Sequence, residues 1–188
     1  MSSGKDALFN DNVGPSLYHK GQGLPVKIWG FLANGTLKYH LLPASRKDKR
    51  KTTNMNIKSF CSLVRSKFGK WRQQLLRTRR CAIIQDHERC LWNAASIASL
   101  RKAGCDVIQS FPKASPDLNP IENVWKQLRE ELERTSPPEL EGRAAFVKRL
   151  STTVRRLNAK HKHQMKALCN MRKRCEDVLK LKGCRTKW

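Results

Sequence analysis

Residues 115–125 read SPDLNPIENVW, and they form the one stretch of the chain whose chemistry is hard to explain by packing alone. Asn119 is a residue type that caps helices, Pro120 suits the first helical position, and Glu122 follows at the spacing of a capping box. Apolar residues then recur at three- and four-residue steps as far as Leu132, which gives the segment one apolar face. The stretch predicts an amphipathic helix with an acid in its first turn.

The composition of the chain favours a polyanionic partner. Its 188 residues allow one domain of ordinary size with extensions. The formal net charge is +24, from 39 Lys and Arg against 15 Asp and Glu. Nucleic acid suits this charge better than a membrane surface, because basic residues are spread over the whole chain and no stretch of eighteen apolar residues occurs. A basic protein without such a partner is the alternative.

The seven cysteines are expected to be reduced, because their number is odd and no secretory signal is recognised. A zinc site in the tail is the alternative, built from His161, His163, Cys169, Cys175 and Cys184. The spacing of these residues lacks a CxxC pair, so the pattern disfavours zinc.

The first half of the chain predicts a hairpin followed by a helix. Apolar runs over 26–32 and 36–42 flank Asn34 and Gly35, a pair typical of a hairpin turn. Apolar residues then recur at helical spacing over about 54–76, while most of the basic residues fall on other positions.

The middle of the chain predicts alternating strands and helices. A short apolar strand over 81–84 leads into Asp86, a helix over about 92–102 ends before a glycine, and a short strand over 106–110 precedes the helix at Asn119. This order indicates an α/β fold, a mixed sheet flanked by helices, with the end of the first of these two strands near the start of that last helix.

A long helical region over about 139–181 follows two consecutive prolines. Its first half carries an apolar stripe and is expected to pack on the sheet, whereas the tail is open between packing and a basic arm along DNA. We divide the chain into a poorly defined N-terminal segment (1–24), a core (25–135) and a basic helical C-terminal extension (136–188).

Two acids are candidates for a metal site. Asp86 stands at the carboxyl end of a buried strand, where loops commonly open onto a cleft, and Glu122 stands in the first turn of the later helix. If both face one cleft, their oxygens suit Mg²⁺ or Mn²⁺. Two such ions about 3.5 to 4 Å apart would activate a water or a 3′ hydroxyl for phosphodiester transfer.

Three segments together resemble the catalytic domain of mariner-type transposases, in the DDE transposase and integrase superfamily. They are QDHERCLW (85–92), FPKASPDLNPIENVWKQLREEL (111–132) and VKIWGFLANGTLKYHLLP (26–43). The resemblance covers about residues 25 to 135, and SPDLNPIENVW is its most specific part.

The resemblance implies a ribonuclease H-like fold in which Asp86 is the second acid of the family and Glu122 the third. Both would bind Mg²⁺ or Mn²⁺ and support cleavage and transfer of DNA strands in the nucleus. The partners implied are transposon ends and target duplex, with no membrane, and a homodimer is open. Asp117, inside the same motif, is expected to turn the chain by hydrogen-bonding backbone amides.

The first acid of the family is the weak point of the match. Asp6 and Asp11 are the candidates, and neither follows an apolar strand. The chain also shows no helix-turn-helix region ahead of the core, so we expect it to be truncated at its start. Three interpretations stay open: a metal-dependent DNA phosphoryl transferase, a non-catalytic basic remnant that binds nucleic acid, and a structural protein in which the acids only cap a helix and turn the chain.

Overall fold

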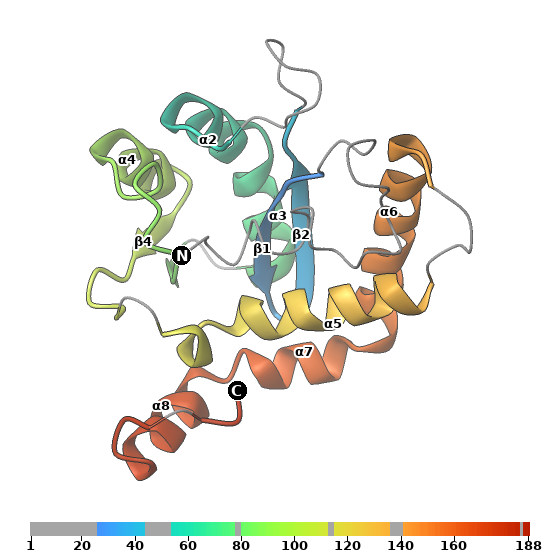
Figure 1. The fold of residues 1–188 in the computed structure, drawn as a ribbon. Coiled ribbons are helices and arrows are strands. Elements are labelled where there is room, and N and C mark those ends of the chain that lie inside the picture. Colours follow the sequence, from blue (N-terminus) through green and yellow to red (C-terminus); the bar gives the residue numbers. More distant parts are fainter. Residues whose placement is uncertain (1–25, 44–53, 78–79, 113–114, 136–140, 185) are drawn as a thin grey trace.

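The structure is a computed structural model. It describes residues 26–43, 54–77, 80–112, 115–135, 141–184 and 186–188. Figure 1 shows a β-hairpin at the centre, with α4 (Ala94–Lys102) and β4 (Cys105–Val107) on one side of it and α6 (Arg143–Lys160) on the other.

The hairpin is formed by β1 (Ile28–Ala33) and β2 (Thr36–Leu41), which pair antiparallel. The turn residues Asn34 and Gly35 have φ of 47° and 68°. A two-residue turn with both φ positive matches the right-handed twist of the flanking strands, and Asn-Gly adopts it at low cost. The predicted hairpin is therefore confirmed.

The outer edge of β2 is covered by α6. Leu37 faces Leu32 across the hairpin, and the Leu37 N–H donates to Asn158 Oδ1 at 2.8 Å. Asn158 Nδ2 in turn donates to the Leu37 carbonyl at 3.0 Å. One side chain thus satisfies both backbone groups that this residue directs away from β1.

The predicted helix over 54–76 forms, with an irregular middle. It consists of α2 (Ile57–Leu63), a π-helical segment η1 (Val64–Phe68) and α3 (Gly69–Leu76). A capping box starts it, in which Asn56 Oδ1 accepts from the Ser59 N–H and Ser59 Oγ accepts from the Asn56 N–H, each at 2.9 Å. Side-chain periodicity does not reveal a π-helical turn, because the apolar face stays almost continuous across it.

The strand before Asp86 is β3 (Cys81–Ile83), which pairs in parallel with β4. The connection between them contains α4, the usual crossover for parallel strands. The predicted α/β class and mixture of strand directions are confirmed. Within the described residues the strands make two separate two-stranded sheets, and a cavity of about 460 Å³ is lined by residues of both β1 and β3.

Helices cover both faces of the hairpin. Ile28 and Trp29 are adjacent in β1 and therefore point to opposite faces. Trp29 packs edge-to-face on Phe60 and Phe68, with ring centroids 5.8 and 6.0 Å apart. Ile28 belongs to the other core, which is built with α5 (Pro120–Arg134), α6 and α7 (Lys162–Leu168).

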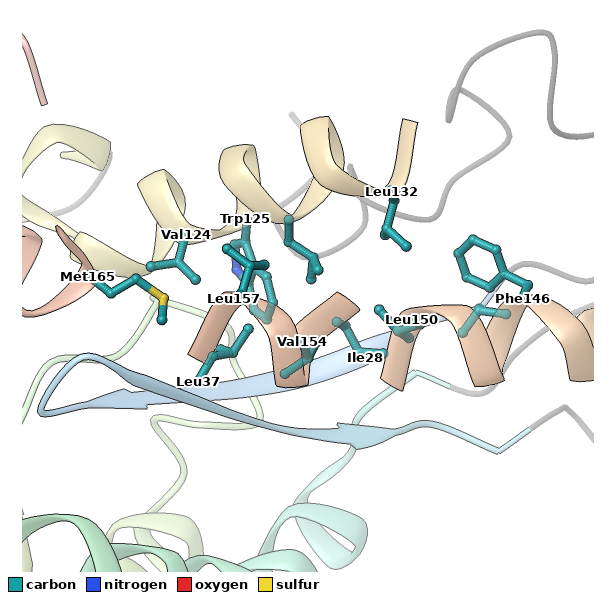
Figure 2. Close-up of a cluster of buried hydrophobic side chains, with 12 residues drawn as sticks. Ile28, Leu37, Val124, Trp125, Leu132, Phe146, Leu150, Val154, Leu157 and Met165 are labelled. Atoms are coloured by element: carbon teal, nitrogen blue, oxygen red, sulfur yellow. The ribbon is translucent and has the colours of Figure 1, made fainter. Parts of the chain in front are cut away.

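The core on the Ile28 face is shown in Figure 2, where side chains of α5 point toward those of α6. The apolar stripe predicted for the first half of the C-terminal region is buried in it, which confirms that this half packs. The residues of that stripe are Phe146, Leu150, Val154 and Leu157.

None of the described helices has the length and apolar character that a membrane span needs. All seven cysteines are free.

Candidate active site

Asp86 lies three residues after β3, in an irregular segment that side chains hold on both sides. The preceding Gln85 is buried, and its Nε2 donates to the Leu91 carbonyl at 3.3 Å. Trp92 Nε1 donates to the Asp86 carbonyl at 2.9 Å, and the Trp92 ring stacks on His87 with centroids 4.8 Å apart. The backbone around the acid is therefore fixed on both sides.

Asn119 contacts Asp86 instead of capping its own helix. The sequence predicts a side-chain cap for α5, but Asn119 makes no such hydrogen bond. Its Nδ2 donates to Asp86 Oδ1 at 2.9 Å. The prediction of a capping box from Asn119 and Glu122 is therefore wrong. The Asn119 side chain instead donates to a charged carboxylate, which forms a stronger hydrogen bond than a neutral acceptor does.

This hydrogen bond joins the end of β3 to the start of α5. The sequence predicted that these two element ends lie near each other, and the contact confirms it. Glu122 stands in the first turn of α5, where a carboxylate is favoured by the helix dipole. Asp86 is thus bonded to Asn119, which lies about one helical turn before Glu122.

The two acids line different cavities, so the expectation that both face one cleft is not confirmed. Asp86 and Asn119 line the cavity that also borders β1 and β3. Glu122 lines a polar cavity of about 790 Å³, together with Lys126 and residues of the C-terminus such as Trp188. Both acids are half-buried.

Asp117 has a structural role that differs from the predicted one. It lies in the 3-10 turn η2 (Pro116–Leu118), and its Oδ2 accepts from Thr186 Oγ1 at 3.4 Å. Its carbonyl accepts from Arg174 Nη1. We expected the carboxylate to bond backbone amides near the turn, whereas the contacts described for it come from the C-terminal end of the chain.

Sequence reasoning missed Arg174, a fully buried residue of α8 (Met171–Lys180). It stands in a run of basic residues, three positions after Met171 and four before Val178. That spacing puts Arg174 on the apolar face of the helix, and it is the one feature of the sequence that indicates its burial.

The donor set of the site suits a hard divalent cation. Asp86 and Glu122 supply carboxylate oxygens, the ligands that Mg²⁺ and Mn²⁺ prefer. Among the residues described, no three His, Cys, Asp or Glu side chains gather into a group that could hold a metal ion. Asp6 and Asp11, the candidates for the first acid, lie outside the described residues. The acids present fit the cation in chemical type.

Comparisons with known proteins connect this arrangement to one family. The family model described as DDE superfamily endonuclease matches residues 47–141. Among solved structures, the Mos1 transposase catalytic domain with raltegravir and Mg is similar at a TM-score of 0.60 and 13% identity, over 87% of this chain and 78% of that one.

The catalytic domain of Mos1 mariner transposase is similar at a TM-score of 0.62 and 15% identity, over 87% of this chain and 77% of that one. At these identities the likeness establishes the fold, and the predicted ribonuclease H-like fold is confirmed. A search of curated proteins finds no match.

Proposed function

Since the chain belongs to the DDE superfamily of endonucleases, we propose that it catalyses metal-dependent cleavage and transfer of DNA strands. The observation that carries the proposal is the hydrogen bond from Asn119 to Asp86, which fixes one acid at the start of the helix that bears the other. These residues lie in two of the three segments whose sequences resemble mariner-type transposases.

Asp86 and Glu122 would hold Mg²⁺ or Mn²⁺ in this proposal. A bound cation supplies charge stabilisation and an acidified water or 3′ hydroxyl in phosphoryl transfer. Asn119 orients the carboxylate of Asp86 through its Nδ2, the part that outer residues commonly play around metal ligands. Trp92 holds the same residue through its backbone carbonyl. The position of Asp86 is therefore set from both its side chain and its main chain.

DNA is the partner in the proposal, and the net charge of +24 supports it. The proposal includes a nuclear location, supported by the basic run RKDKRK at 46–51, which lies outside the described residues. A homodimer stays open in the proposal.

Glu122→Gln is expected to reduce nicking of supercoiled plasmid in Mn²⁺ or Mg²⁺ by about 100-fold, because an amide removes the negative charge that binds the cation. Substitution of a residue that only orients a metal ligand already lowers metal affinity or activity by about 10- to 100-fold. Glu130→Gln is the matched control, since it makes the same change at an exposed position of the same helix. The control should nick within about twofold of the wild-type rate.

A wild-type chain that nicks no DNA with either cation contradicts the enzymatic proposal. Equal rates for Glu122→Gln and Glu130→Gln would exclude Glu122 from the site.

The second candidate function is non-catalytic binding of nucleic acid, which the charge of +24 favours. We expect the affinity for duplex DNA to fall at least about tenfold between 50 and 200 mM NaCl, because basic side chains displace counterions from phosphates. Fluorescence anisotropy with a labelled duplex measures it. Salt-dependent binding without nicking would favour this candidate, and an affinity that stays flat with salt would exclude it.

A further inference from the structure

Arg174 is a buried cation, whereas most of the other basic residues that the structure describes are exposed. Its exposed fraction is 0%, whereas the side chain of its neighbour Arg172 is 90% exposed. Removal from water disfavours the charged guanidinium, and burial lowers the pKa of Arg174. A buried Arg is stable only where its donors find acceptors, so its partners show what the residue holds together.

The guanidinium bonds three separate segments. Nε donates to the Leu168 carbonyl at the end of α7 at 2.7 Å, and Nη1 donates to the Asp117 carbonyl in η2. Nη2 donates to Asn123 Oδ1 in the first turn of α5 at 2.7 Å. Because the donors of a guanidinium lie in one rigid plane, a single side chain sets the relative positions of all three segments.

Two of these acceptors bracket the residues of the candidate site. Asp117 lies two residues before Asn119, which donates to Asp86, and Asn123 directly follows Glu122. Arg174 therefore bonds the motif on both sides of Asn119 and Glu122. The third acceptor, the carbonyl at the end of α7, connects these bonds to the helical core.

The C-terminal residues cover the guanidinium. The Trp188 ring lies over Arg174, with Cζ 4.7 Å from the ring centroid, and Trp188 Nε1 donates to Asp177 Oδ2 at 2.9 Å. Thr186 Oγ1 donates to the carboxylate of Asp117 at 3.4 Å. Stacking of a cation on an indole is favourable.

We propose that Arg174 is a positioning residue for the site of Asp86 and Glu122, and that it sets the affinity of the site for its divalent cation through Asp117 and Asn123. The inference rests on the proposed function. Metal ligands must be held within about 0.5 Å of the productive geometry, so a small shift of the turn before α5 weakens binding. Helix α8 then helps to position the metal ligands, although it supplies none of them.

The test compares Arg174→Lys with Arg172→Lys in the full chain. Lys keeps the charge but cannot bond three segments from one rigid plane. Mn²⁺ affinity is measured by electron paramagnetic resonance, alongside plasmid nicking, DNA affinity and the thermal midpoint. We expect Arg174→Lys to bind Mn²⁺ about tenfold more weakly, with DNA affinity within about twofold. Arg172→Lys should match the wild type in every measurement, because its side chain is exposed.

A folded Arg174→Lys variant with wild-type Mn²⁺ affinity overturns the inference. Where Arg174→Lys does not fold, Asn123→Ala tests the same link, because it removes one acceptor and leaves Arg174 its two carbonyl partners. An unchanged Mn²⁺ affinity in that variant also overturns the inference. A wild-type chain that binds Mn²⁺ but nicks no DNA removes the enzymatic proposal alone, and one that binds no Mn²⁺ removes both.

Discussion

Asp86→Asn is expected to lower metal-dependent nicking of DNA by more than about 100-fold while the protein stays folded. The substitution keeps the shape of the side chain, and the new amide oxygen can still accept the hydrogen bond from Asn119 Nδ2. It removes the negative charge that would bind the cation. Initial nicking rates in Mg²⁺ and Mn²⁺ and the thermal midpoint measure the two effects separately.

Asp106→Asn is the matched control for that variant. Asp106 lies on the neighbouring strand β4 and pairs with Arg80 at 2.7 Å, with half of its side chain exposed. Exposed ion pairs contribute little, so the control should nick at about the wild-type rate. Wild-type nicking by Asp86→Asn would remove Asp86 from the mechanism. Asp6→Asn and Asp11→Asn, run in the same assay, test whether either residue is the first acid.

Gly30→Ala is expected to destabilise the protein by about 3 kcal/mol, the upper part of the usual range for overpacking a core. A Cβ at Gly30 would lie 2.3 Å from Cη2 and 2.4 Å from Cζ2 of Trp125. Trp125 is only 3% exposed and belongs to the core between the hairpin and α5, so moving its ring would disturb the packing of that core. Thermal and urea denaturation measure the loss.

The control for this prediction is Gly69→Ala. A Cβ at Gly69 meets only the Val64 carbonyl, at 3.8 Å, and its φ is −56°. Alanine is the better helix former, so we expect this variant to gain about 0.5–1 kcal/mol of stability. Gly30→Ala with an unchanged midpoint would show that β1 and α5 separate more easily than the packing indicates.

Local patterns predicted the elements of this protein well. The Asn34-Gly35 turn, the strand that leads to Asp86 and the amphipathic helix after Pro120 each depend on residues close together in sequence, and each forms. The ribonuclease H-like fold followed from the resemblance of three segments, because periodicity by itself specifies strands and helices but not their topology.

Contacts between distant residues were beyond the sequence patterns. Asn119 has the residue type and position of a helix cap, yet its amide bonds Asp86, and only the folded chain brings these two side chains together. The parallel pairing of β3 with β4 has the same cause, since these strands are joined only through the crossover that contains α4. In the sequence Arg174 resembles its basic neighbours, and its burial follows only from the contact between α8 and η2 in the folded chain.

The bond between Leu37 and Asn158 has a consequence for synthesis of the chain. These residues are 121 positions apart, so the outer edge of β2 emerges from the ribosome long before α6 can cover it. At about 5–20 residues per second, the delay is roughly 6–24 s. An uncovered strand edge invites pairing with other chains during that time. Binding of a chaperone to the nascent hairpin would shield this edge until α6 is made.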